Sequence, residues 1–233
     1  MTSLNRTLVI MAKAPRPGTV KTRLAKQLPV QAVTELYRCL LQDTISLAQT
    51  LSHVDLAIIC PSSDVEELSG AAGNAIPIVP QVGNGLAAGL SSVFAHFASA
   101  RDRQVVAFNS DSPHLPASIL ENAFHVLTGN DIVVGPTYDG GYYLVGATAS
   151  HPGLFTGDAM GTASAFDALQ ARARALGLSV RVSDPFYDID EPPDLHRLAV
   201  ELQFAPQRAP RTAAWLAEWK QALPEQPSSI GAP

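Results

Sequence analysis

Short, continuously apolar runs alternate with longer segments of helical periodicity along most of this chain, and this alternation constrains the fold more than any other feature. The apolar runs predict strands at residues 8–12, 54–60, 76–80, 105–109, 131–135, 142–147 and 178–183. The periodic segments predict helices at residues 30–51, 63–72, 86–98, 117–127, 163–176, 191–203 and 211–223. Strands without polar alternation are buried on both faces, so helices must cover both sides of a mostly parallel sheet. We therefore predict an α/β protein, a three-layer α/β/α sandwich with a Rossmann-like, mostly parallel mixed sheet.

The connection between the runs at 131–135 and 142–147 breaks this regular pattern. The intervening residues are too few for the crossover helix that joins parallel strands. We therefore expect an antiparallel or irregular pairing close to residues 138–141.

Length and composition bound the number of domains and the kinds of partner. With 233 residues, 46% of them hydrophobic, the chain can bury a sizeable core, and we predict a single domain over residues 1–223. Residues 224–233, PEQPSSIGAP, lack the apolar surface to fold and predict a flexible tail. A formal net charge of -5 gives no general attraction to nucleic acid or to an anionic membrane. The N-terminal apolar run is too short for a signal sequence or a membrane span, so we expect a cytoplasmic protein.

The loop after the first predicted strand, APRPGTVKTRLA (14–25), is close to a phosphate-binding P-loop but lacks its glycines. Val20 precedes Lys21 where the P-loop requires glycine, and Pro15 stands five positions earlier. An ATPase of this type is therefore not predicted. The loop still carries a concentration of cations that suits phosphate, namely Lys13, Arg16, Lys21 and Arg23.

Two further loops follow predicted strands at the sheet edge where ligands of α/β proteins bind. Asp111 comes two residues after the run at 105–109, and it suits either a metal site or an Asx turn or helix cap. The turn at Asp139, Gly140 and Gly141 allows a sharp bend and the close approach of a ligand. Asp139 would accept hydrogen bonds from the hydroxyl groups of that ligand. The same three residues also suit a plain hairpin turn.

The segment after the last predicted strand, DPFYDIDEPPDL, contributes three further carboxylates. Asp194 falls in the first turn of a predicted helix, where the helix dipole stabilises it. We expect Asp188 and Asp190 to point to opposite sides of an extended segment, so that one of them faces the site. Asp111 and Asp190 would then hold a divalent ion beside phosphates bound by the lysines and arginines of the first loop.

Four motifs occur in the order KAPRPGTVKTRLA, NSDSPHLP, DGGYYLVG and YDIDEPPDL, and together they resemble a known family. They look like the bacterial GT-A-like family of arsenosugar-biosynthesis-type glycosyltransferases, and the match spans residues 8–198. The chain is more distantly similar to nucleotidyltransferases that make molybdenum-cofactor dinucleotides and the guanylylated lactate precursor of coenzyme F420.

The resemblance implies a nucleotide-diphospho-sugar transferase fold and a role for several residues. It implies that Asp111 and Asp190 bind Mg2+ or Mn2+. The residues it implies for the nucleotide phosphates are Lys13, Pro15, Gly18, Lys21 and Arg23. Those implied for the substrate are Gln81, Asp139, Gly140 and Gly141, with Lys21 and Asp139 as catalytic candidates.

The chain also departs from the family pattern after its third predicted strand. Where relatives carry an acid and a base in a Q-x-x-G-D-L-G-x-R-like segment, this chain has Gly85 and Gly89. Met160 stands close to a tryptophan position of the relatives.

Three functions follow from these observations. The first is glycosyl transfer from a nucleotide sugar to a small-molecule acceptor. The second is nucleotidyl transfer from a nucleoside triphosphate to a phosphorylated small molecule, which the basic first loop favours. The third is a nucleotide-binding protein without turnover, which the departures at Gly85 and Gly89 favour. The predicted helix that carries Trp215 and Trp219 is a candidate homodimer surface, and the alternative is that it packs on its own sheet.

Overall fold

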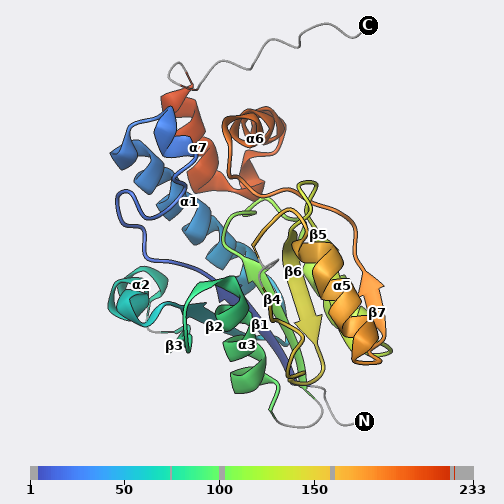
Figure 1. Ribbon diagram of the computed structural model, residues 1–233. Coiled ribbons are helices and arrows are strands. Elements are labelled where there is room, and N and C mark those ends of the chain that lie inside the picture. The colour runs from blue at the N-terminus through green and yellow to red at the C-terminus, as the bar shows by residue number, and fades with distance from the viewer. Residues whose placement is uncertain (1–4, 74, 100–102, 158–160, 221–222, 224–233) are drawn as a thin grey trace, which may run out of the picture.

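A computed structural model describes residues 5–73, 75–99, 103–157, 161–220 and 223 (Figure 1). Met160 and the predicted tail at 224–233 lie outside this part of the chain. Within it, one sheet has the strand order β3-β2-β1-β4-β6-β5-β7. The strands are β1 (Asn5–Met11), β2 (Asp55–Cys60), β3 (Ile78–Pro80), β4 (Arg103–Asn109), β5 (Ile132–Pro136), β6 (Tyr142–Ala147) and β7 (Val180–Val182).

Strand β6 alone among these runs against its neighbours, and the others pair in parallel. It is antiparallel to both β4 and β5, and the β5–β6 pairing is irregular between Gly135 and Pro136. The antiparallel pairing that the short connection predicted is confirmed. Each predicted strand is present, and the last one is shorter than expected, with three residues.

Helices cover both faces of the sheet, which confirms the three-layer α/β/α sandwich (Figure 1). They are α1 (Val30–Gln49), α2 (Val65–Ala72), α3 (Gly85–Phe97), α4 (Ala117–Val126), α5 (Ala165–Ala175), α6 (Pro192–Phe204) and α7 (Pro210–Trp219). Side chains of α1, α2 and α4 pack in one apolar cluster with one sheet face, and those of α3 and α5 pack in another with the opposite face. No helix in the described ranges is long and apolar enough to cross a membrane.

A third apolar cluster joins α1, α6 and α7 at the end of the sheet where the candidate site lies. Trp215 is buried in this cluster, and its ring stacks on that of Trp219 with 5.5 Å between the centroids. Trp215 thus packs within its own chain, which is the alternative to a dimer surface for this helix, and a homodimer stays a prediction. Periodicity alone does not distinguish an apolar stripe that meets its own chain from one that meets a partner.

Candidate metal and phosphate site

Backbone hydrogen bonds bring the segment after β7 against the loop after β4. The amide of Ile189 donates to the carbonyl of Asp111 at 3.0 Å, and the hydroxyl of Ser112 donates to the carbonyl of Tyr187 at 3.0 Å. Earlier in the same segment, the amide of Phe186 donates to the carbonyl of Pro136 at the end of β5. These bonds hold acids that are about 80 residues apart in the sequence at one edge of the sheet.

Three carboxylates meet at this edge. Asp111, Asp188 and Asp190 each offer an oxygen atom, and these atoms lie within 4.8 Å of one another. The prediction that Asp188 and Asp190 point to opposite sides is wrong. Side chains alternate along an extended segment, so residues two positions apart share a side, and Ile189 between them is the buried residue that faces away.

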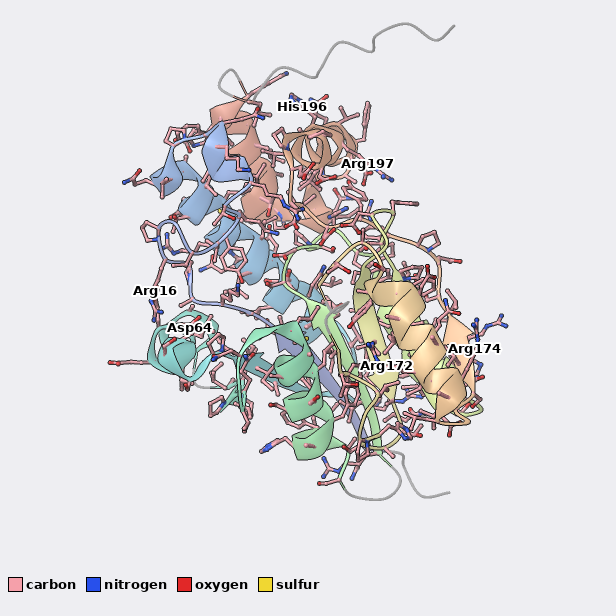
Figure 2. The ribbon with its side chains drawn as sticks, in the orientation of Figure 1. Arg16, Asp64, Arg172, Arg174, His196 and Arg197 are labelled. Atoms are coloured by element: carbon pink, nitrogen blue, oxygen red, sulfur yellow. The ribbon has the colours of Figure 1, made fainter. Side chains whose placement is uncertain are left out.

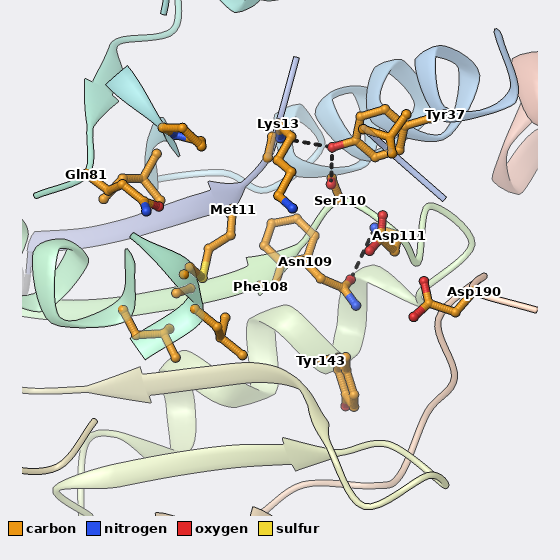
Figure 3. A pocket seen from close by; sticks show the side chains of 18 of the residues that line it. Met11, Lys13, Tyr37, Gln81, Phe108, Asn109, Ser110, Asp111, Tyr143 and Asp190 are labelled. Carbon is orange, nitrogen blue, oxygen red and sulfur yellow. Dashed lines mark hydrogen bonds between the residues drawn. The ribbon is translucent and has the colours of Figure 1, made fainter. Parts of the chain in front are cut away.

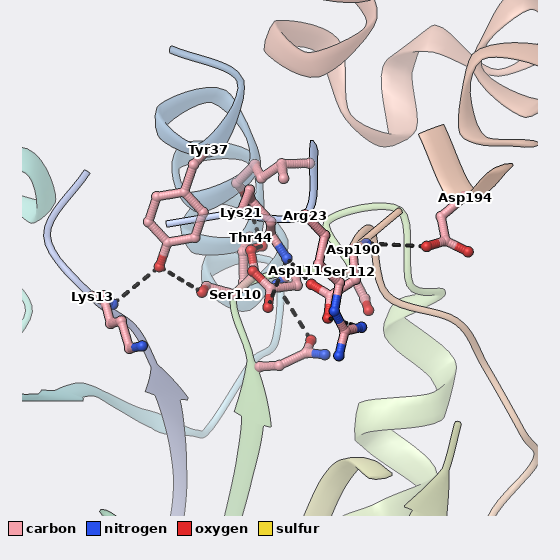
Figure 4. A network of polar contacts seen from close by, with 12 residues as sticks. Lys13, Lys21, Arg23, Tyr37, Thr44, Ser110, Asp111, Ser112, Asp190 and Asp194 are labelled. Carbon is pink, nitrogen blue, oxygen red and sulfur yellow. Dashed lines mark hydrogen bonds and ion pairs between the residues drawn. The ribbon is translucent and has the colours of Figure 1, made fainter. Parts of the chain in front are cut away.

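Lys21 lies among these carboxylates (Figure 4). Its ammonium nitrogen is 2.8 Å from Asp190 Oδ1 and 3.0 Å from Asp111 Oδ2, and 3% of its side chain is exposed. Burial alone would lower the pKa of Lys21, but the charges of Asp111 and Asp190 outweigh it and raise this pKa. Lys21 in turn lowers the pKa of Asp190. The ammonium group thus stays charged and neutralises part of the acidic cluster.

The acidic cluster has a carboxylate oxygen without a partner and uncompensated negative charge, and both suit a divalent cation. Asp111 Oδ1 is buried and has no hydrogen-bond partner in the described structure, which is costly for a carboxylate oxygen. Burial, followed by the charge of Asp190, raises the pKa of Asp188 to about 7. Mg2+ and Mn2+ prefer carboxylate oxygens and would relieve both effects. The chemistry of these donors therefore fits a metal ion held by Asp111, Asp188 and Asp190, and Asp188 is a ligand candidate that the sequence reasoning set aside.

A pocket of about 670 Å³ opens beside the cluster, at the carboxyl ends of β1, β2 and β4 (Figure 3). Its apolar lining includes Met11, Ile59, Leu86 and Leu90 together with residues of β4 and β6, and the volume suits a nucleotide-sized ligand. Lys13 also lines it, and a hydrogen-bonded chain fixes the Lys13 backbone. The Lys13 amide donates to the hydroxyl of Tyr37 at 3.0 Å, and this hydroxyl also bonds Ser110 Oγ at 3.0 Å.

Three of the four cations of the first loop, Lys13, Lys21 and Arg23, line this pocket, but most of the loop cations are paired with acids. Arg16 turns toward α2, where its guanidinium lies 2.7 Å from Asp64 and 2.8 Å from Glu67 (Figure 2). Arg23 lies 3.6 Å from Asp190 and 3.5 Å from Glu191. Of the three loop cations that line the pocket, Lys13 is the one without an ion pair to a described residue.

Pro15 and Gly18, predicted to bind phosphate, are not among the residues that line this pocket. Pro15 is buried, and Gly18 has a φ of +76°, a conformation that favours glycine. They shape the loop that presents Lys13 and Lys21. Gln81 does line the pocket, and its side-chain amide donates to the carbonyl of Gly83 at 3.0 Å.

The two glycines that depart from the family pattern meet different local constraints. A Cβ atom at Gly89 would lie 2.9 Å from both Gln81 Oε1 and Met11 Cε, which are the far ends of flexible side chains and would have to move. Gly85 lines the pocket at the first turn of α3 with open space around it, but its φ of +82° favours glycine. A side chain at position 89 would therefore displace two side chains, whereas one at position 85 would strain the backbone.

The Asp139–Gly141 turn is held by its own hydrogen bonds. Asp139 Oδ1 accepts from the hydroxyl of Thr137 and from the amide of Gly141. Gly140 has a φ of +88°, and a Cβ atom there would lie 1.9 Å from the carbonyl oxygen of Ala163. The close backbone approach that the glycine permits is thus to the chain itself, in agreement with the hairpin-turn interpretation. Asp139 also lines a second pocket, described below.

His114 lies in the loop after β4 but is buried, unlike most loop histidines. The His114 side chain is fully buried against the rings of Phe186 and Tyr187, and it contributes to neither pocket.

Asp111 does not cap the following helix, because the N-cap of α4 is Pro116 and makes no side-chain cap bond. The helix-cap alternative for Asp111 is therefore wrong.

A family model described as an uncharacterized protein conserved in bacteria (DUF2064) matches residues 44–162, slightly more than half of the chain. The chain belongs to the DUF2064 family. The matched residues include β4, Asp111 and the Asp139–Gly141 turn, but not the first loop or the acids at 188 and 190. A search of curated proteins finds no match.

Solved structures extend the likeness to nearly the whole chain. A Desulfovibrio desulfuricans G20 protein, named provisionally as a nucleotide-diphospho-sugar transferase, superposes with a TM-score of 0.85 at 28% identity, covering 94% of this chain and 96% of its own. The 4-diphosphocytidyl-2C-methyl-D-erythritol synthase of Anaerococcus prevotii shares 11% identity, with a TM-score of 0.56 and coverage of 85% and 96%. Rv0371c of Mycobacterium tuberculosis H37Rv, in a manganese complex, shares 20% identity, with a TM-score of 0.50 and coverage of 84% and 98%. The fold of this family member is that of nucleotide-diphospho-sugar transferases, as the four motifs indicated.

Proposed function

We propose that this protein is a metal-dependent transferase that uses a nucleotide-activated donor, and that it transfers a glycosyl group from a nucleoside diphosphate sugar to a small acceptor. The observation that carries the proposal is the placement of Asp111, Asp188 and Asp190 beside a pocket of about 670 Å³. The D. desulfuricans neighbour, named provisionally as a nucleotide-diphospho-sugar transferase, supports the donor class, and the manganese complex of Rv0371c supports the metal.

In the proposed reaction an acceptor hydroxyl oxygen forms a bond to the anomeric carbon of the donor sugar. The bond between that carbon and the diphosphate oxygen breaks, the nucleoside diphosphate leaves with the electron pair, and the hydroxyl proton passes to solvent. A metal ion bound at the three acids would supply positive charge to the departing diphosphate. Lys13 binds a phosphate from the pocket wall, and Lys21 keeps positive charge at the boundary between phosphates and acids.

Nucleotidyl transfer is the second candidate, supported by the fold likeness to the A. prevotii synthase. A nucleoside triphosphate carries more negative charge than a nucleoside diphosphate sugar, so its binding requires more cations. In this structure Arg16 is held on α2 and Lys21 is paired with two acids, which leaves fewer loop cations for a triphosphate than the sequence suggested. This observation favours glycosyl transfer.

Titration calorimetry with a panel of nucleoside triphosphates, diphosphates and diphosphate sugars, with and without Mn2+, tests the proposal. We expect a diphosphate or diphosphate sugar to bind with Mn2+, and Asp111→Asn to weaken this binding at least about tenfold through loss of a charged ligand. Glu121→Gln is the matched control, since it removes one negative charge from the exposed face of α4.

The outcomes separate the candidate functions. Metal-dependent binding of triphosphates alone would favour nucleotidyl transfer. Binding without product formation in any acceptor mixture would favour a nucleotide-binding protein without turnover. If no nucleotide binds, or if Asp111→Asn and Glu121→Gln behave alike, the proposed function is wrong.

A further inference from the structure

A second pocket lies on the other side of the acidic cluster. It has a volume of about 360 Å³, and its walls come from the β5–β6 turn, the segment after β7 and the first turns of α6. Arg23 and Asp190 line both pockets, so the predicted metal site stands at the boundary between them. A ligand in the second pocket would face the reacting end of a donor bound in the first.

We propose that this second pocket is the acceptor subsite, and that it takes a small, uncharged molecule with several hydroxyl groups rather than a phosphorylated one. The inference rests on the proposed function, because it assigns the acceptor class for the same reaction. It deepens that function by excluding the phosphorylated acceptors that nucleotidyl transfer to a phosphate would require.

Charge is the first argument. The acids that line the pocket are Asp139, Asp188, Asp190, Glu191 and Asp194. The lining cations are Arg23 and Arg197, and each already faces a carboxylate: Arg23 that of Asp190 or Glu191, and Arg197 that of Glu201 at 3.2 Å. The five acids exceed the two arginines by three charges, and a divalent ion at Asp188 and Asp190 would offset two of these. A phosphate monoester would still meet a net negative lining, and the donor diphosphate would add to it.

The shape and chemistry of the wall are the second argument. The guanidinium of Arg197 lies 3.9 Å from the ring centroid of Tyr187 and 5.6 Å from that of Tyr138, so the three side chains form one stacked wall (Arg197 on α6, Figure 2). Tyr138 is 65% exposed, which leaves aromatic surface for the apolar face of a sugar or polyol ring. Carboxylate oxygens such as those of Asp139 accept hydrogen bonds from hydroxyl groups. The volume suits a molecule no larger than about a monosaccharide.

Ligand-observed NMR by saturation transfer tests the acceptor class directly. The full chain with Mg2+, with and without the nucleoside diphosphate that calorimetry identifies, is mixed with matched pairs: glycerol and glycerol 3-phosphate, glucose and glucose 6-phosphate, and inositol and inositol 1-phosphate. We expect a neutral member to bind, and its phosphorylated partner to bind at least about tenfold more weakly. Tyr138→Ala should weaken the neutral ligand about two- to tenfold.

Phe204→Ala is the control variant, because Phe204 is an aromatic residue of α6 that is 84% exposed and lines neither pocket. It should leave binding unchanged, and both variants should bind the nucleoside diphosphate like wild type. Preference for a phosphorylated member, binding of no neutral member, or equal effects of the two variants would overturn the acceptor assignment. If wild type binds no nucleotide, the proposed function itself is wrong. Failure of the acceptor assignment and failure of the proposed function are therefore distinguishable.

Discussion

The ammonium group of Lys21 bridges Asp111 and Asp190, at 3.0 and 2.8 Å from their carboxylate oxygens. These are two of the three acids proposed to hold the metal, so an ion that binds them must share their charge with Lys21 or displace it. Repulsion between two cations a few ångströms apart is substantial in a partly buried site. Metal binding therefore depends on whether another anion can pair with the Lys21 ammonium group. The diphosphate of a bound donor is such an anion.

This relationship predicts that Lys21→Gln binds Mn2+ more tightly than wild type in the absence of nucleotide. We expect an increase in affinity of about tenfold or more, together with lower thermal stability without metal, because two acids lose their buried partner. Electron paramagnetic resonance of free Mn2+ measures the affinity. Lys13→Gln is the control, since it removes the same charge from the pocket wall without an ion pair to the acids. Equal or weaker Mn2+ binding by Lys21→Gln would contradict the prediction.

Asp188 predicts a stability that depends on pH between about 4 and 7. Its pKa is raised to about 7 from an ordinary value of 3.8, so the folded protein keeps a proton that the unfolded chain loses. The contribution of Asp188 to stability therefore falls as pH rises through this window. Asp188→Asn stays uncharged and should gain stability relative to wild type between pH 5 and pH 8, by at most about 3 kcal/mol. Urea unfolding of both proteins at the two pH values measures the difference, and a pH-independent difference would refute the prediction.

The buried His114 predicts that stability falls as the pH falls, which is opposite to the effect of Asp188. Burial, followed by the charges of Arg208 and Arg197, lowers the pKa of His114 to about 3 from 6.5. The unfolded chain therefore binds a proton below pH 6.5 that the folded protein does not, and stability is lost as pH falls. His114→Phe fills the same aromatic contacts without titrating, and at pH 5 it should be about 2 kcal/mol more stable relative to wild type than at pH 7.5. The control is His125→Gln, which removes a histidine from the exposed face of α4 instead of from the core. If the two variants differ from wild type in the same way at both pH values, burial of His114 is not the cause.

Gly140 and Gly153 allow steric clash to be separated from backbone strain. Both have a φ of +88°, but a Cβ atom would lie 1.9 Å from the Ala163 carbonyl at Gly140, whereas it would meet nothing within 4 Å at Gly153. Gly153→Ala should therefore cost about 1 kcal/mol of unfolding free energy, from the left-handed conformation alone. Gly140→Ala should cost roughly 3 kcal/mol or more, because the turn must also move away from Ala163. Chemical denaturation measures both, and equal losses would show that the close approach is not maintained in solution.

The sequence by itself determined the layers of the fold and the edge at which the site forms. Continuously apolar runs require burial on both faces, and the short connection before β6 excludes a crossover helix; both statements depend on local pattern and chain length. The same reasoning identified Asp111, Asp190 and the first loop as parts of one site, because the carboxyl ends of parallel strands meet at one edge.

Only the tertiary structure decided how these residues are used. The hydrogen bond from the Ile189 amide to the Asp111 carbonyl, with that from Ser112 to Tyr187, sets which acids converge. These bonds bring Asp188 into the cluster beside Asp190, where sequence reasoning expected Asp190 alone of the two. An ion pair with Asp64 holds Arg16 outside the first pocket, and ion pairs with Asp111 and Asp190 occupy Lys21 in the wall of that pocket. Both outcomes depend on acids distant in the sequence. Likewise, Trp215 is buried because α1 and α6 meet α7. Local patterns fix the conformation of a segment, whereas the pairing of charges and the burial of a face depend on which segments the folded chain places in contact.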